Sequence, residues 1–117
     1  MKLYAVRIFV FDFPRACDFY GGTLGLSERM RLDEAGWAEF DVGGVALGIE
    51  RIDRNDPEAD LVGRFVGISL SIEDMDAAYA RLCAADVVFE APPERQPWGG
   101  TLAHFRDPDG NVLTLIG

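Results

Sequence analysis

Histidine occurs once in this 117-residue sequence, at His104. In a two-fold dimer with one site per subunit, each site can contain at most one histidine, because each chain supplies only one. Only a site on the symmetry axis could contain two histidines. A metal centre built on two histidines away from that axis is therefore excluded. The Lewis-acid and dioxygen chemistry of such centres is excluded with it.

Cysteine is nearly as scarce, with Cys17 and Cys83 alone. Both fall in predicted helices, and their spacing is not that of metal ligands. We expect free, buried thiols and a cytoplasmic protein, because the cytoplasm keeps thiols reduced.

Long apolar runs and excess positive charge are also missing. No apolar run approaches the roughly 20 residues of a membrane helix, and the N-terminus MKLYAVRIFV alternates like a strand, unlike a signal peptide. The 11 Lys and Arg are outnumbered by 20 Asp and Glu, which gives a net charge of −9. Nucleic acids and anionic membranes would be repelled. We therefore expect neither as a partner, and the charge favours a neutral or cationic small ligand.

The sequence does contain one pattern that occurs twice. The stretches AVRIFVFD and GISLSIED are each rich in strand-forming residues and end in aspartate, at Asp12 and Asp74. Each aspartate can cap a helix, formed by RACDFY in the first half and by MDAAYARLCAAD in the second.

Three strand-like segments follow each predicted helix. They are SERMRL, GWAEFDV and VALGIERI in the first half, and VVFEAP, TLAHFR and NVLTLIG in the second. Gly43-Gly44 and Asp109-Gly110 are the predicted hairpin turns. The length suits one domain. We predict an α+β fold of two βαβββ modules, residues 1–52 and 64–117, joined by an acidic linker, residues 53–63.

This organisation resembles the vicinal oxygen chelate superfamily of glyoxalases, bleomycin-resistance proteins and extradiol dioxygenases. The resemblance rests on Asp12 with Phe19-Tyr20 and Leu24-Gly25, on Asp74, and on the hairpin Asp107-Pro108-Asp109-Gly110-Asn111. It implies that the two modules pair into a cupped, barrel-like mixed sheet that holds a ligand, and that the protein is a homodimer.

Alternation within the predicted strands divides them into a face under the helices and a face toward the cup. The residues predicted to face the cup are Ala5, Arg7, Phe9, Ala46, Gly48, Glu50, Gly67, Ser69, Ser71 and Thr114.

Metal-dependent members of the superfamily use two histidines and two carboxylates on these strands. The resemblance places the corresponding positions at Ala5, Gly48, Gly67 and Thr114. None of these binds a divalent ion well, and Glu50 beside Gly48 would supply a single ligand. We therefore expect no metal and no cofactor.

Trp98, in QPWGG, is predicted to lie in a loop at the rim of the cup. It is either a packed lid or a stacking platform for a flat ligand. The second interpretation follows from resemblance, because bleomycin-resistance proteins have a similar Trp-Gly motif whose tryptophan stacks on the aromatic tail of the antibiotic. The stretch DEAGWAEF, residues 33–40, resembles the strand that lines the same groove.

Other candidate residues have alternative interpretations. Trp37 and Phe40 lie on opposite faces of one strand, and we favour Trp37 with Glu39 in the groove, although Trp37 also suits a dimer contact. Arg7 is interpreted as a buried cation paired with Glu50 or Glu39, or as an anion-binding group. For His104, a hydrogen-bonded structural role competes with that of a general base.

Three functions are open at this point. The first is a metal-free, dimeric binding protein for a small flat compound, such as an antibiotic or toxic metabolite. The second is a metal-independent isomerase or lyase that transfers protons through Glu50, Glu39 or His104. The third is a metal-dependent glyoxalase-like lyase.

Overall fold

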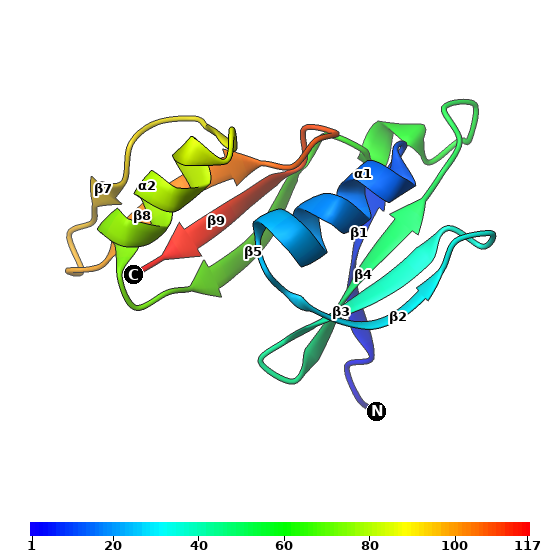
Figure 1. Cartoon of the computed structure of the whole chain (residues 1–117), viewed down its shortest axis with the longest axis horizontal. Coiled ribbons are helices and arrows are strands. Elements are labelled where there is room, and N and C mark those ends of the chain that lie inside the picture. Colours follow the sequence, from blue (N-terminus) through cyan, green and yellow to red (C-terminus); the bar gives the residue numbers. More distant parts are fainter.

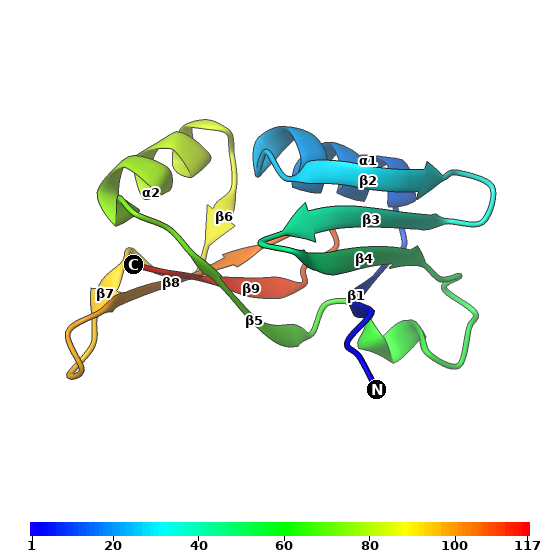
Figure 2. The same ribbon diagram turned by 90° about the horizontal axis from the view of Figure 1, so that it is seen from below.

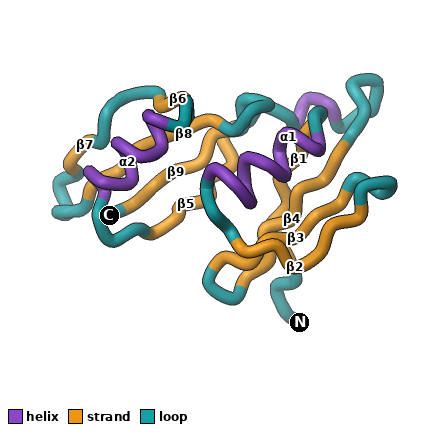
Figure 3. The backbone as a smooth tube through the Cα atoms, viewed as in Figure 1, coloured by secondary structure: helices purple, strands orange, loops and turns teal.

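The computed structural model describes residues 1–117, and it consists of two mixed sheets with both α-helices on the same side (Figures 1 and 2). Figure 3 distinguishes its helices, strands and loops. The first sheet has the order β1-β4-β3-β2, from β1 (Ala5–Val10), β2 (Ser27–Leu32), β3 (Trp37–Val42) and β4 (Val45–Arg51). The second has the order β5-β9-β8-β6, with β7 also paired to β8. Its strands are β5 (Phe65–Ser71), β6 (Val88–Phe89), β7 (Glu94–Arg95), β8 (Thr101–Arg106) and β9 (Val112–Ile116).

The two sheets have the same topology. In each, the first strand is parallel to the last, β1 to β4 and β5 to β9, and the remaining pairs are antiparallel. The predicted α+β fold of two βαβββ units is confirmed. No strand of one sheet pairs with a strand of the other, so one chain does not close into a barrel.

Both helices begin at the predicted aspartates. The Asp12 carboxylate accepts a hydrogen bond from the backbone N–H of Arg15 at 3.3 Å, and α1 (Phe13–Cys17) then continues as a π-helix, Asp18–Thr23. The Asp74 carboxylate accepts from Ala77 at 3.0 Å and starts α2 (Met75–Ala84). These side chains satisfy N–H groups that have no partner within the helix. Neither helix is long and apolar enough to span a membrane.

The structure corrects the sequence prediction in two places. The predicted strand VVFEAP is reduced to the two residues of β6, because Pro92 and Pro93 cannot donate to a ladder, and the short β7 follows them. Cys83 is exposed and Cys17 is buried, so the prediction that both thiols are buried is wrong for Cys83; both are free. A 3₁₀ turn, Ala59–Leu61, lies in the predicted linker.

One apolar core lies between the helices and the two sheets. Its 17 buried residues include Ile8 and Phe40 of the first sheet, Phe105 and Leu113 of the second, and Tyr20 beside them. None of the core residues is among those predicted to face the cup. The opposite face of the sheets is left for the predicted cup.

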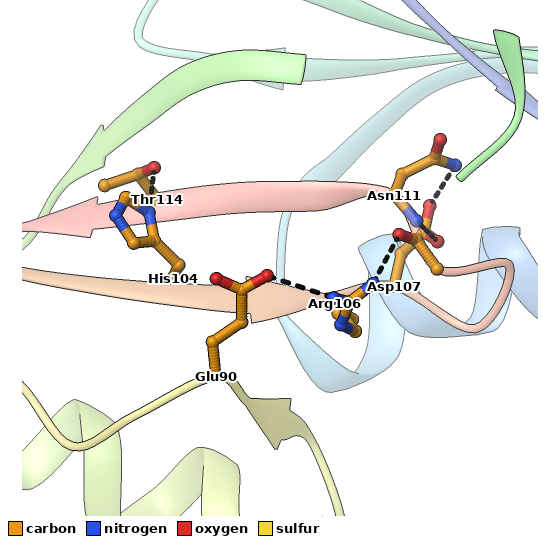
Figure 4. Close-up of polar contacts among 7 residues, drawn as sticks. Glu90, His104, Arg106, Asp107, Asn111 and Thr114 are labelled. Atoms are coloured by element: carbon orange, nitrogen blue, oxygen red, sulfur yellow. Dashed lines mark hydrogen bonds and ion pairs between the residues drawn. The ribbon is translucent and has the colours of Figure 1, made fainter. Parts of the chain in front are cut away.

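The hairpin between β8 and β9 is folded around the Asp107 carboxylate. One of its oxygens, Oδ1, accepts hydrogen bonds from the backbone N–H groups of Asp109 and Asn111, both at 2.9 Å. Figure 4 shows Asp107 and Asn111 side by side at this turn. Gly110 has φ 87°, a left-handed conformation that glycine adopts without strain.

The same hairpin is bonded to the first half of the chain. Tyr20 donates its hydroxyl to Asp107 Oδ2 at 2.8 Å, and Asn111 donates its amide to the carbonyl of Phe9 at 2.9 Å. Asp109 Oδ2 accepts from the backbone N–H groups of Phe11 and Asp12 at 3.1 and 3.2 Å. The turn that contributes to the family resemblance in the sequence therefore also fixes the second half of the chain to the first.

Burial is the main cause of the shifted pKa values of two groups in this network, Asp107 and Tyr20. It raises the pKa of Asp107, and hydrogen bonds from Asn111 and Tyr20 lower it in part. Burial, followed by the charge of Asp107, raises the pKa of Tyr20 well above 10. The Tyr20 hydroxyl therefore keeps its proton, and its hydrogen bond to Asp107, to strongly alkaline pH.

We predict that Asn111→Asp strongly lowers the free energy of unfolding. The new carboxylate would have no amide donor for the Phe9 carbonyl and would lie beside the Asp107 carboxylate. An unpaired buried charge costs about 3–5 kcal/mol of unfolding free energy, measurable in urea melts. Asn55→Asp is the matched control, because Asn55 is exposed, and it should have little effect. Equal stability of both variants would contradict the structural role of the hairpin.

Candidate functional site

The face of the first sheet opposite the helices presents three rows of side chains across β1, β4 and β3. The rows, given by strand register, are Ala5-Ala46-Asp41, Arg7-Gly48-Glu39 and Phe9-Glu50-Trp37. Figure 2 shows both α-helices above the sheets, and below them only the short 3₁₀ turn Ala59–Leu61. We call this surface, with its counterpart on the second sheet, the cup face.

Trp37 and Glu39 are joined on the cup face by a hydrogen bond. The indole Nε1–H of Trp37 donates to Glu39 Oε2 at 2.8 Å, and the Tyr4 hydroxyl donates to the same oxygen at 2.8 Å. Glu39 is 5% exposed, whereas Tyr4 is 70% exposed. Phe40 is fully buried in the core, on the opposite face of β3. The predicted division of this strand, with Trp37 and Glu39 toward the cup, is the one observed.

The Trp37 ring lies directly over Gly48. A Cβ at position 48 would overlap the ring atom Cη2 of Trp37, so only glycine fits beneath it. Gly48 is one of the positions that the resemblance matches to a metal ligand. In this chain, an aromatic ring occupies the space into which a ligand side chain would project.

Arg7 pairs with Glu50, at 3.0 Å between Nη1 and Oε1. This is one of the two predicted partners, but the prediction that Arg7 is buried is wrong: the side chains are 54% and 27% exposed. An ion pair this exposed contributes about 0–1 kcal/mol to stability. The Arg7 guanidinium also lies 5.3 Å from the centre of the Phe9 ring, so Phe9, predicted to face the cup, is buried beneath it.

On the second sheet, His104 and Thr114 face each other across β8 and β9 (Figure 4). His104 Nδ1 lies 2.8 Å from Thr114 Oγ1, and the Phe65 ring and the imidazole form a T-shaped pair with 5.7 Å between centres. No carboxylate bonds to His104, and Glu90 nearby pairs with Arg106 at 3.1 Å. This arrangement favours the structural interpretation of His104.

Ser69 and Ser71 are exposed on β5 and make no hydrogen bond to His104. Ser69 instead borders an apolar crevice of about 180 Å³ between the two sheets, lined by Val6, Ala46 and Ile68 among others. A nucleophilic serine activated by histidine and a carboxylate is therefore not assembled here.

The residues at the expected metal positions do not fit a metal. Ala5, Gly48 and Gly67 offer no side-chain donor, and the Thr114 hydroxyl is bonded to His104. No three side chains of His, Cys, Asp or Glu lie close enough together to hold an ion.

Trp98 lies in the loop between β7 and β8 and is 61% exposed. Its ring rests on Gly100, where a Cβ would overlap it. The interpretation of Trp98 as a packed lid does not hold within one chain. Figures 1 and 2 both place this loop and the β2–β3 turn, which precedes Trp37, at opposite ends of the molecule, whose longest extent is 42 Å.

The two largest cavities lie away from these residues. Each is about 380 Å³. One is bordered by Phe19, Asp86 and Arg106, and the other lies beside Phe13 and Arg54. The cup face of a single chain is thus an open surface, not an enclosed cavity.

A family model of the Glyoxalase/Bleomycin resistance protein/Dioxygenase superfamily matches residues 2–115. The chain belongs to this superfamily. The resemblance inferred from Asp12, Asp74 and the Asp107–Asn111 hairpin is confirmed.

Two curated proteins and one solved structure illustrate the relationship. An uncharacterized protein, YraH, of Bacillus subtilis is 33% identical over 98% of this chain and 97% of its own length. A bleomycin resistance protein of Klebsiella pneumoniae is 31% identical over 90% of this chain and 83% of its own. A superfamily member from Sphaerobacter thermophilus has 32% identity and a TM-score of 0.79, over 99% of this chain and 96% of that one.

Sequence reasoning missed several side chains at the cup face, among them Tyr4 and Phe65. Tyr4 precedes β1 and lies outside any strand pattern, and Phe65 precedes the segment predicted as a strand from Gly67. Phe65 could have been found, because Phe65, Gly67 and Ser69 continue one alternation. Nothing in the sequence pairs Tyr4 with Glu39, 35 residues away.

We predict that Gly48→Ala destabilises the protein by about 1–3 kcal/mol in urea melts, because the added methyl group displaces the Trp37 ring. Gly22→Ala is the matched control, since nothing lies within 4 Å of its Cβ position. The control should be neutral or gain about 0.4–1 kcal/mol. If both variants behave alike, Trp37 does not enforce glycine at position 48.

Proposed function

We propose that this protein binds a small, flat, neutral or cationic compound between the cup faces of two copies, without a bound metal. The observation that carries the proposal is an exposed tryptophan, Trp98, on a short loop, together with Trp37 on the cup face. A large aromatic ring left in water, as Trp98 is, suits stacking on a ligand.

The need for two copies follows from the distance between Trp98 and Trp37 within one folded chain. The loop that carries Trp98 and the turn before Trp37 lie at opposite ends of the molecule (Figure 1). One small ligand can contact both rings only if they come from different subunits. Met30 and Leu32 of β2, and Phe65 of β5, are exposed apolar residues on the cup face that a second copy would cover.

A metal-free site is supported by the residues on the cup face. The expected ligand positions hold no suitable side chains, and Trp37 fills the space above Gly48. A ligand would be held by stacking, hydrogen bonds and charge.

Sequestration of an antibiotic or other toxic compound is the specific form of the proposal. It draws support from the 31% identity to the Klebsiella bleomycin resistance protein and from the net charge of −9, which favours cations. The alternative of a metal-independent isomerase or lyase has less support. Glu50 is engaged with Arg7, and His104 with Thr114.

We predict that thermal-shift screening of antibiotics and aromatic metabolites yields compounds that raise the melting temperature in a concentration-dependent manner. For such a compound, Trp98→Ala should weaken binding by about 1–3 kcal/mol, by analogy with stacking on nucleobases. That corresponds to roughly tenfold to a hundredfold in Kd.

Stability provides the control for this variant. Because Trp98 is largely exposed, Trp98→Ala should change the unfolding free energy by no more than about 0.5 kcal/mol. Unchanged affinity in Trp98→Ala, or a screen without any stabilising compound, would count against the proposed function.

We also predict that elemental analysis of purified, tag-free protein finds zinc, nickel, iron and manganese well below one ion per chain. Treatment with a chelator should leave the melting temperature unchanged, because no folding free energy comes from a metal. One tightly held ion per chain would refute the metal-free proposal.

A further inference from the structure

Glu39 is a buried carboxylate without a cationic partner. Its side chain lies on the cup face of β3 and is 5% exposed, yet no arginine or lysine approaches it within ion-pair distance. Buried charges in proteins are normally paired, since removing an ion from water costs several kcal/mol unless an opposite charge compensates.

Two arginines on the same sheet as Glu39 are engaged elsewhere. Arg7, in the same row of the sheet, pairs with Glu50 at 3.0 Å. Arg29 pairs with Asp41 at 2.8 Å and also donates to the carbonyl of Gly44. The chain itself therefore supplies no counter-charge for Glu39.

Only one oxygen of the carboxylate is used by the chain. Trp37 and Tyr4 both donate to Oε2, and no group donates to Oε1. The only fully enclosed side-chain nitrogen or oxygen without a hydrogen-bond partner is Arg64 Nε. Since Glu39 Oε1 also lacks a partner, it is not fully enclosed and retains some accessible surface.

The surroundings of this oxygen suit a flat cation. The Trp37 indole, fixed by its hydrogen bond to Glu39 and by close packing on Gly48, forms a rigid aromatic wall beside the carboxylate. Aromatic faces attract cations. Tyr4 precedes β1 and is largely exposed, so its side chain can yield to an entering group. The pKa of Tyr4 is raised, first by its hydrogen bond to Glu39 and then by the negative charge of that carboxylate.

We propose that Glu39 is the counter-ion for an ammonium or guanidinium group of the ligand, which binds at Oε1 against the Trp37 ring. This inference rests on the proposed binding function and narrows its ligand from neutral or cationic compounds to aromatic cations. Neither Glu50 nor Asp41 can take this role as readily, because each already pairs with an arginine.

The test compares two probes of the same shape, 2-naphthylmethylammonium and the neutral 2-naphthalenemethanol. Binding to the full-length protein is measured by tryptophan fluorescence and by the NMR signal of the Trp37 Nε1–H. We expect the ammonium probe to bind at least tenfold more tightly than the alcohol and to shift that signal. Glu39→Gln should bring the ratio of the two affinities close to one.

Glu28→Gln is the matched control, because it removes the same charge from an exposed side chain on the opposite face of the first sheet. It should keep the ratio of the unaltered protein. A ratio near one in the unaltered protein, or a ratio that Glu39→Gln leaves unchanged, would overturn the inference while leaving the binding function standing. Failure of both probes to bind also counts against the inference, and the thermal-shift screen then decides separately whether the binding function survives.

The melting temperature of the free protein gives a second readout. If Glu39 is an uncompensated charge, Glu39→Gln should leave the melting temperature unchanged or raise it, since the glutamine oxygen can still accept from Trp37 and Tyr4. A fall of many degrees would assign Glu39 to the fold instead, and would overturn the inference.

Discussion

The buried hydrogen-bond network around Asp107 and Asn111 is the constraint on which the rest of the structure depends. It is the place where the second sheet is bonded to β1, to the start of α1 and to Tyr20, across 87 to 102 residues of sequence. No strand of one sheet pairs with the other, so these bonds and the shared apolar core hold the two sheets together. Because the network is buried and its polar groups are paired, the loss of one partner would leave others unsatisfied.

With the two sheets fixed on one side by the hairpin and the helices, their opposite faces are free to form a site. On the first sheet, three residues depend on one another: Gly48 leaves room for the Trp37 ring, and Trp37 holds the Glu39 carboxylate. A side chain with a metal-binding group at position 48 would not fit with this arrangement. The chain thus has the family fold with an aromatic ring and a buried carboxylate side by side on its cup face.

Much of the fold could be predicted from the sequence because its signals are local. Alternation located β2, β3, β4, β8 and β9, and the aspartates at positions 12 and 74 located both helix starts. The same alternation assigned Trp37, Glu39 and Thr114 to one face. The features that could not be predicted depend on contacts between residues that are distant in the sequence. The hairpin was found as a turn, but its bonds to Tyr20 and Phe9 have no signature in sequence spacing.

Burial was also hard to predict for single charged residues. Arg7 was expected to be buried and is half exposed, whereas Glu39 is almost fully buried because Tyr4 and Trp37 cover it. Trp98 is exposed because it lies in a short loop beside two glycines, and these have no side chains to cover its ring. The exposure of such a side chain depends on which other side chains cover it. Alternation along a strand indicates only the face of the sheet on which it lies.

The central claim is that two copies share each binding site, and mixed dimers test it most directly. A dimer purified with one Trp98→Ala chain and one Glu39→Gln chain, selected by two different tags, has both changes in one of its two shared grooves. The other groove is unaltered. Titration with 2-naphthylmethylammonium should therefore find one site of unaltered affinity per dimer. If no such site appears, or if the chain remains at 12.9 kDa in light scattering and still binds, the site lies within a single chain and the account is contradicted.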